Sequence, residues 1–411
     1  MVGHQCCAAD AGRAGGALGG KPRAGFQTLG RKPEGRLVKD MTQPPANRRL
    51  ALKTAAMMVA GLSAWPTQIA AASALEAPFY PPVKPRRLNF PRDHGSHPDY
   101  RTEWWYLTGW LGQGPSAMGF QLTFFRRRTQ HSPENPSRLA PKQLLFAHAA
   151  VAVASKNVFL HANRAGRLNG TLLRAETTDT DVQFEDWHLR RVQGAAGEVY
   201  TGRFAGEGFA VSLDASAAQP ALLRGQEGFS SKGPDALQAS HYYSRAPLNV
   251  KAAVTLGKQT QTLEGKAWLD HEWSSQLMVP GAVGWDWLGI NLLDGGTLMA
   301  FQIRNDKAAS IYAHVDARDA AGRPAKGWQG MRWQSAGRWR AKSLIDYPIP
   351  MDLWVGQERY SLVPLMLGQE VDARASTGGF YWEGAVSLMQ GERLLGHGYL
   401  ELTGYGAPLK I

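Results

Sequence analysis

Apolar and polar residues alternate along much of the chain, and the alternation has the two-residue period of β-strands. It is clear in residues 182–190, 208–214 and 248–256. This period places every second side chain on the same face of a strand. Glycine-containing turn signals separate such stretches at intervals of about ten residues, and a helical period is hard to find. The pattern predicts an all-β fold of short antiparallel strands.

Many short antiparallel strands leave unpaired sheet edges unless the sheet closes on itself. Closure into a barrel removes those edges. The length of 411 residues is too great for one ordinary hydrophobic core. We therefore expect two antiparallel β-barrels in tandem, each either filled by side chains or large enough for one small ligand.

An internal repeat supports a tandem arrangement. Residues 104–122 align without gaps on residues 285–303, and seven of the nineteen positions are identical. Both segments have the pattern of a strand, a glycine-containing turn and a second strand. A second pair of similar hairpins contains residues 265–270 and 396–401. The repeat predicts a first barrel over residues 75–275 and a second over residues 276–411.

Charge and cysteine content exclude several classes of protein. The formal net charge is +12, but residues 1–74 hold ten Lys and Arg and only three Asp and Glu, so the remainder carries about +5. In that remainder the basic residues are interspersed with acidic ones, and we expect no nucleic-acid binding. Both cysteines, Cys6 and Cys7, lie in the first ten residues, so the body has neither disulfides nor cysteine-ligated zinc.

The N-terminal region has the features of an export signal. Arg48 and Arg49 form a twin-arginine pattern, an apolar run follows at 55–65, and small residues at 70–74 offer a cleavage site. The pattern resembles a bacterial twin-arginine signal over residues 41–74, which predicts a periplasmic protein without stable membrane insertion after cleavage. Residues 1–40 are then expected to be an extension upstream of the true start codon. An uncleaved anchor or a buried helix is the alternative.

The residues between Asp93 and Leu111 concentrate polar and aromatic side chains. Asp93, His94, His97 and Asp99 carry groups that can bind a metal. They lie on a loop, however, where a three-residue spacing fixes no common face. The alternative is that they hydrogen-bond one another and close the mouth of the first barrel. We predict no metal and no cofactor.

The segment 268–273, with the sequence WLDHEW, is the strongest candidate for chemistry. Alternation places Trp268, Asp270 and Glu272 on one strand face, and Leu269, His271 and Trp273 on the other. A carboxylic acid buried among aromatic rings has a raised pKa and can donate a proton. The rings can stabilise the resulting cation. This combination suits the acid-catalysed addition of water to an alkene.

A structural role is the alternative for the same residues. Asp270 and Glu272 can pair with arginines such as Arg101 or Arg245 and fasten one barrel to the other. The sequence carries no serine-hydrolase elbow, phosphate-binding loop, dinucleotide fingerprint or zinc-protease motif.

Five segments resemble the AttH-like family, which is grouped with carotenoid 1,2-hydratase. They are DHGSHPDYRTEWWYLTGWL, HYYSRAPL, GKAWLDHEWSS, GWDWLGINLLDGG and GYLELTGY, and the resemblance spans residues 91–404. It implies a secreted protein of two lipocalin-like barrels. For a hydratase it would place the acid at Asp270, with His241, Tyr243 and Trp268 lining the site.

The resemblance leaves the function open between three classes. The leading hypothesis is an exported binder of a lipophilic molecule, an isoprenoid or a lipid, that assists an ABC-transporter permease or an envelope-lipid process. The alternative is a hydro-lyase that adds water to an isoprenoid alkene, and the third is an interaction module without a ligand. The candidate catalytic residues are Asp270, His241 and Glu272. The candidate ligand-binding residues are Trp104, Trp105, Tyr106, Tyr243, Trp268, His271, Trp273, Trp285 and Trp287.

Overall fold

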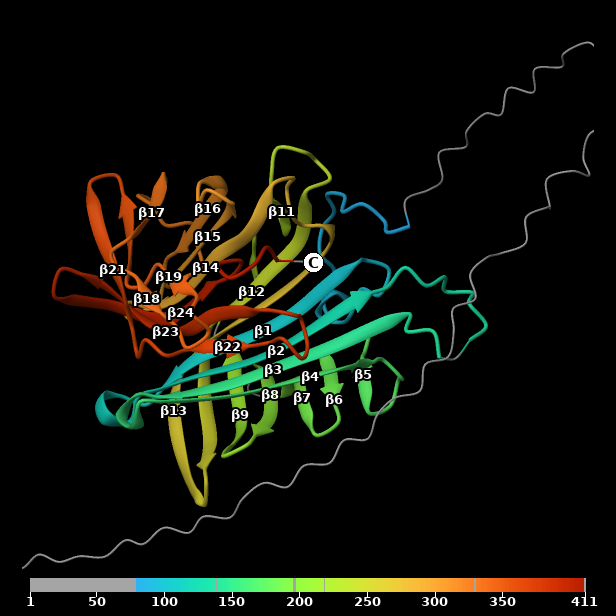
Figure 1. Ribbon diagram of the computed structural model, residues 1–411, viewed down its shortest axis with the longest axis horizontal. Helices are drawn as coiled ribbons and strands as arrows, with labels where there is room; N and C mark the ends of the chain where they lie inside the picture. The colour runs from blue at the N-terminus through green and yellow to red at the C-terminus, as the bar shows by residue number, and fades with distance from the viewer. Residues whose placement is uncertain (1–78, 138, 195–196, 218, 329, 410–411) are drawn as a thin grey trace, which may run out of the picture. The chain divides into compact units, whose positions relative to one another are not determined.

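The computed structural model describes residues 79–137, 139–194, 197–217, 219–328 and 330–409. The expected extension and signal, at 1–40 and 41–74, lie outside the described residues. Figure 1 shows that the described chain is built of β-strands. Apart from three 3₁₀ turns, the described residues contain no helix, and none of them forms a helix long and apolar enough to cross a membrane. The 3₁₀ turns are η1 (Arg92–His94), η2 (Gly114–Ser116) and η3 (Ala154–Lys156).

The first sheet holds the strands of the N-terminal half. Its hydrogen-bonded order is β4-β3-β2-β1-β13-β12-β9-β8-β7-β6-β5, and β10 and β11 both pair with β12. The strands are β1 (Thr102–Leu111), β2 (Met118–Arg128), β3 (Gln143–Val153), β4 (Val158–Arg167), β5 (Leu173–Ala175), β6 (Asp181–Phe184), β7 (Trp187–Gly194), β8 (Gly197–Gly206), β9 (Phe209–Ala217), β10 (Leu222–Leu223), β11 (Phe229–Ser231), β12 (Ala239–Leu256) and β13 (Gln259–Gln276).

The second sheet holds the C-terminal half. Its order is β16-β15-β14-β24-β23-β21-β20-β17, with β22 paired to β23, and β18 and β19 form a separate ribbon. The strands are β14 (Ala282–Leu292), β15 (Thr297–Asn305), β16 (Ser310–Arg318), β17 (Met331–Ser335), β18 (Trp339–Arg340), β19 (Asp346–Tyr347), β20 (Met351–Val355), β21 (Glu358–Pro364), β22 (Glu370–Asp372), β23 (Phe380–Gln390) and β24 (Arg393–Leu402). The two sheets form two nearly closed antiparallel barrels, which confirms the predicted fold class.

The internal repeat corresponds to matching parts of the two sheets, with one correction. In the first sheet β1 lies between β2 and β13, and in the second β14 lies between β15 and β24. Leu107 pairs with Leu122, and the ungapped alignment predicts that Leu288 pairs with Ile303. Leu288 pairs instead with Ala300. The second hairpin is three residues shorter, so the two hairpins superpose through their first strands only.

Strand β13 confirms the predicted alternation, and its residues 267–274 are buried on both faces. Its inward side chains are Leu269, His271 and Trp273, and its outward side chains are Trp268, Asp270 and Glu272. The inward side chains belong to the first barrel, while the outward ones face strands of the second. One strand therefore contributes to two different environments.

Each barrel has a packed interior of its own. The first core contains Trp105, Trp187 and Tyr200, and none of the three exposes any surface. The second core contains Tyr347 and Trp382. Large side chains fill the space inside a barrel that could otherwise hold a small ligand.

Buried charges close one end of the first barrel. Glu103 is fully buried, and it lies opposite Arg126 on the neighbouring strand, 2.7 Å from its Nε. The Glu103 carboxylate also accepts hydrogen bonds from the His97 backbone, from Nδ1 of His97 at 2.7 Å, from Nε2 of His271 at 3.0 Å and from Ser96. Burial alone would raise the pKa of Glu103, but Arg126 and these hydrogen bonds hold it well below its usual value.

The polar loop before β1 continues this network. His97 Nε2 lies 3.0 Å from Asp93, which also accepts hydrogen bonds from Arg86, and His94 Nδ1 lies 2.7 Å from the hydroxyl of Tyr243. The structure thus matches the alternative in which the loop histidines and Asp93 hydrogen-bond one another. Asp99 is exposed and takes no part in the network.

We predict that Glu103→Gln destabilises the protein by about 3–5 kcal/mol at neutral pH, because it leaves the buried Arg126 uncompensated. Since folding lowers the pKa of Glu103, its contribution is present above the unfolded value of 4.5 and is lost as pH falls below it. Denaturant titrations from pH 7 to 3 should show the difference between variant and wild type shrinking. Glu264→Gln, at an exposed position of the neighbouring strand β13, is the control. A pH-independent difference would contradict this account.

We predict that Gly119→Val disturbs the contact between the barrels. A Cβ atom at Gly119 would lie 2.7 Å from Cβ of Ala385 and 2.9 Å from the hydroxyl of Tyr399, both in the second barrel. Overpacking of this kind costs about 1–3 kcal/mol. Protease cleavage of the segment 277–281 that connects the barrels should accelerate, while Gly194→Val, an exposed strand position, should leave it unchanged. Equal cleavage of both variants would show that the contact is not tightly packed.

Candidate functional site

A third buried cluster lies between the two barrels, and we call it the junction. It is formed by outward-facing side chains of both sheets. Its buried apolar members are Tyr106, Leu222, Tyr242, Ala246, Trp268, Val279, Trp287, Met299, Phe301, Ile303, Ala385 and Tyr399. Trp104, Trp110 and Trp285 pack at its edge and are half-buried.

Equivalent strands of the two halves meet in the junction. Tyr106 of β1 and Trp287 of β14 occupy corresponding positions of the repeat, and their rings contact edge to face with centroids 5.1 Å apart. Trp268 contacts the same Trp287 ring at 6.0 Å. Aromatic pairs prefer such edge-to-face geometry. The duplicated strands therefore bury their outward aromatic side chains against each other.

Asp270 is buried at the centre of this aromatic cluster. Its carboxylate accepts hydrogen bonds from the Tyr242 hydroxyl at 2.7 Å, from Trp268 Nε1 at 2.7 Å and from Ser244. Burial raises the pKa of Asp270 to about 6, although the Arg224 guanidinium and the three hydrogen bonds oppose the shift. The indole of Trp287 donates to the same Tyr242 hydroxyl, at 3.1 Å. Asp270 is thus linked to both barrels through one tyrosine.

Two buried cations connect the barrels beside Asp270. Arg224 donates to Ser244 at 2.8 Å and to Asp316 of the second barrel at 2.8 Å. Lys232 lies 2.9 Å from Glu272, and its ammonium sits 4.3 Å above the ring of Phe301. Glu272 also accepts a hydrogen bond from Ser240. Glu272 is therefore engaged in an ion pair with Lys232, while Arg245 pairs with Glu198.

Glu401 occupies the position in the second barrel that corresponds to Asp270 in the first. Asp270 lies opposite Tyr106 on β1, and Glu401 lies opposite Trp287 on β14. The carboxyl of Glu401 accepts one hydrogen bond, from Trp285 Nε1 at 2.9 Å. Burial raises its pKa to about 7, above the value for Asp270. Fewer donors stabilise the ionised form of Glu401, so a larger fraction of Glu401 than of Asp270 holds its proton near neutral pH.

Glu383 lies directly across the ladder from Glu401 and exposes 1% of its surface. Neither of its carboxyl oxygens has a hydrogen-bond partner among the described residues. Burial and the neighbouring Glu401 raise its pKa well above the usual value, while the hydroxyls of Tyr106 and Tyr381 oppose the shift. Asp270, Glu272 and Glu383 are thus buried carboxyl groups among the aromatic rings of the junction, and Glu401 is half-buried beside them.

The structure separates the predicted site residues into two groups. Asp270, Glu272, Trp104, Tyr106, Trp268, Trp285 and Trp287 lie in or at the junction. His241, Tyr243, His271, Trp273 and Trp105 lie on the other face of the same sheet. His241 therefore cannot cooperate with Asp270. Its two ring nitrogens are buried without hydrogen-bond partners, and burial lowers its pKa to about 4.

One group of side chains has the composition of a metal site. Ligand atoms of His97, Glu103 and His271 lie within 4.8 Å of one another. All three residues already hydrogen-bond through these atoms, and the Arg126 guanidinium lies against the same carboxylate. A metal ion there would have to share the Glu103 carboxylate with Arg126, which would leave positive charge uncompensated. The network therefore fits a structural role better than metal binding.

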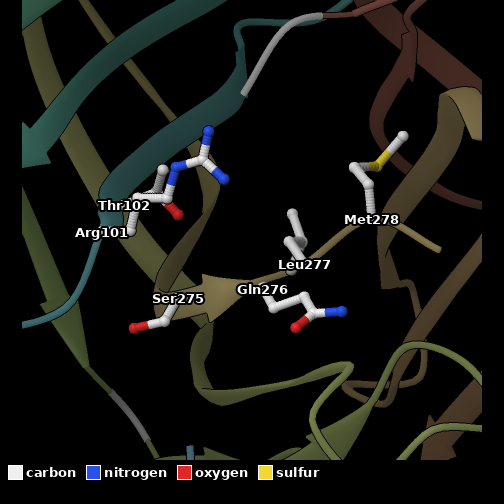
Figure 2. A pocket seen from close by; sticks show the side chains of 6 residues that line it. All are labelled: Arg101, Thr102, Ser275, Gln276, Leu277 and Met278. Carbon is white, nitrogen blue, oxygen red and sulfur yellow. The ribbon is translucent and has the colours of Figure 1, made fainter. Parts of the chain in front are cut away.

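A small cavity lies where the connecting segment leaves the first barrel. It measures about 80 Å³ and is lined by Arg101, Thr102, Ser275, Gln276, Leu277 and Met278 (Figure 2). Pockets for small molecules are usually roughly 300–1,000 Å³. A lipophilic molecule would not fit this cavity.

Several residues of the site were not found from the sequence. They are Glu103 and Arg126 at the barrel mouth, and Arg224, Lys232, Glu383 and Glu401 in the junction. The repeat of 265–270 in 396–401 carried a signal for Glu401, because it aligns that residue with Asp270. Glu383 had no such signal, because its importance depends on strand pairing with Glu401.

The comparisons with known proteins agree with this architecture. The AttH-like family matches residues 81–405. An AttH protein of Nitrosomonas europaea, with a crystal structure at 2.00 Å resolution, is 39% identical to this chain, with a TM-score of 0.71 over 79% of this chain and 99% of that one. Kievitone hydratase of Nectria haematococca shares the fold at 11% identity, with a TM-score of 0.57 over 80% and 98% of the two chains.

None of the curated proteins searched matches the sequence. The family match covers both barrels, the mouth network and the junction. The chain belongs to the AttH-like family.

Proposed function

We propose that this AttH-like protein binds a lipophilic small molecule, an isoprenoid or a lipid, at the junction between its barrels. The supporting observation is the aromatic cluster that both barrels contribute on their outward faces. The barrel interiors are filled by their own cores, so the junction is the remaining surface rich in indole rings. Burial of apolar area against such rings drives the binding of an apolar ligand.

The edge of the junction suits the entry of such a ligand. Trp104, Trp110 and Trp285 are half-buried, and Met278 of the connecting segment packs beside them. Aromatic and methionine side chains form adaptable apolar surfaces. A ligand that replaced contacts between the barrels would keep these side chains buried. The connecting segment would act as the hinge.

We place this activity in the periplasm, after export by the twin-arginine signal. There the protein would assist an ABC-transporter permease or an envelope-lipid process, as the family resemblance implies. A carrier that shields an apolar molecule from water suits such a process, because the molecule has to cross an aqueous compartment between membranes.

We predict that protein isolated from the periplasmic fraction carries a lipophilic molecule that native mass spectrometry detects and denaturation releases. Trp285→Ala should lower its occupancy about tenfold, since truncation of a buried aromatic contact typically costs more than 1 kcal/mol. Trp354→Ala removes a half-buried tryptophan of β20 outside the junction and should leave the occupancy unchanged. A ligand-free wild type, or equal loss in both variants, would refute binding at the junction.

A hydro-lyase is the second candidate, and the buried carboxyl groups favour it. A protonated carboxyl would donate its proton to one alkene carbon, and the π electrons would form the new C–H bond. The aromatic rings would stabilise the cation at the other carbon. Water would then add its oxygen to that carbon and return one proton to the carboxylate, so that one water is consumed per alkene.

We predict that Asp270→Asn abolishes hydration of an acyclic isoprenoid alkene, followed as alcohol product by mass spectrometry. The variant should lose about 1–3 kcal/mol of stability, because three donors lose their charged acceptor. Asp352→Asn, at another buried and hydrogen-bonded aspartate, is the matched control and should keep activity. If Asp270→Asn still formed the alcohol product, Asp270 would not be the acid. If the wild type formed no product, the hydro-lyase function would be rejected.

A further inference from the structure

We propose that Glu383 and Glu401 share a proton in the junction, and that Tyr381 and His148 connect this carboxyl pair to solvent. The pair was not among the residues predicted from the sequence. The inference deepens the hydro-lyase candidate, because the pair would give the junction a second buried proton store beside the acid Asp270. Its test requires no ligand, so it can fail or succeed independently of the proposed function.

Glu383 and Glu401 occupy directly opposite positions on β23 and β24. Glu383 is buried, and Glu401 is half-buried. The groups that most influence their ionisation are each other, tyrosines, Trp285 and further carboxylates. Two adjacent carboxyl groups in such a place cannot both ionise. At least one proton therefore stays on the pair at neutral pH.

The contrast with other buried carboxylates of the chain supports this assignment. Glu103 is paired with Arg126, and Asp286 of β14 lies 2.9 Å from Arg304. Those carboxylates are balanced by guanidinium groups and serve as acceptors. Glu383, with no hydrogen-bond partner for either oxygen among the described residues, is suited to hold a proton that it can give away.

A chain of hydrogen-bonded side chains leads to the surface from Tyr381, whose hydroxyl opposes the pKa shift of Glu383. Tyr381 lies two positions before Glu383 and so shares its strand face. The Tyr381 hydroxyl is 2.7 Å from Nδ1 of His148, and Nε2 of the same imidazole is 2.8 Å from the hydroxyl of Ser376. Ser376 is half-buried in the segment between β22 and β23, and its neighbours Arg374 and Thr377 are exposed.

The ionisation states along the chain suit proton transfer. Burial lowers the pKa of His148 to about 3, so the ring is neutral at physiological pH. A neutral imidazole can accept a proton on one nitrogen and release one from the other. Gln121 donates to the Tyr381 oxygen at 3.3 Å, which leaves the tyrosine hydrogen free to point to His148 or Glu383.

The route requires both barrels. His148 and Gln121 belong to β3 and β2 of the first barrel, while Tyr381 and Glu383 belong to β23 of the second. Proton exchange between the pair and solvent therefore depends on the docked junction. In a catalytic cycle the proton given to the alkene would be replaced by the one lost from the added water, and the chain would keep the pair in exchange with solvent between turnovers.

Infrared spectroscopy of the ligand-free protein tests the pair. The wild type should show the carbonyl stretch of a protonated carboxyl group in a dry environment at neutral pH. Glu383→Gln or Glu401→Gln should remove or shift this band. Glu370→Gln, a half-buried glutamate of the same barrel, should leave it unchanged. Absence of the band in the wild type, or its persistence in both junction variants, would overturn the proposal.

The rate at which that band shifts after mixing with D₂O tests the route. His148→Phe and Tyr381→Phe should each slow the shift about tenfold or more, because exchange would then wait for local opening of the junction. His188→Phe, a half-buried histidine of β7, is the control. If His148→Phe lowers the melting temperature, the test rests on Tyr381→Phe, because that variant keeps the aromatic ring and loses only the hydroxyl. Exchange at the wild-type rate in the folded variants would overturn the route.

Discussion

Residues 267–274 of β13 are buried on both faces of the strand, and the rest of the molecule depends on this constraint. Its inward face places His271 against Glu103, inside the charge network that closes the first barrel. Its outward face places Asp270 in the aromatic junction. A shift of one residue in register would exchange these two sets of side chains. The mouth network and the junction are therefore fixed by the same strand pairing, although they lie on opposite sides of a sheet.

The two halves of the molecule use the same strand order but have diverged in their buried charges. Asp270 accepts three hydrogen bonds and lies near Arg224, so its ionised form is supported even in the apolar junction. Glu401, at the corresponding position, has one donor and a carboxyl neighbour in place of a cation. The duplication thus placed two acids in one interface, and their surroundings give them different affinities for a proton.

The sequence predicted the features that depend on local alternation and on long motifs. The all-β class, the tandem barrels and the two faces of residues 268–273 follow from the two-residue period and the repeat. The sequence-based prediction failed for features that depend on the pairing of strands distant in the chain. The ungapped alignment of Phe120 with Phe301 hides a turn three residues shorter, and Phe120 lies in the first core whereas Phe301 lies in the junction.

The predicted catalytic set shows the same limit. His241 and Asp270 were grouped because the family resemblance implied it, but strand alternation puts their side chains on opposite faces of the sheet. Glu383 and His148 are 235 positions apart and in different barrels. Only the packing of two outward sheet faces brings them together, and no spacing within the chain encodes that packing.

The location of the ligand site is the central claim, and a crystal structure of the protein isolated from the periplasm with its bound molecule tests it most directly. Our account predicts electron density for an apolar molecule between the barrels, in contact with Trp104, Trp285 and Trp287, with the barrels further apart than in the ligand-free form. Density enclosed within the first barrel, beside Trp105 and Trp187, would contradict it.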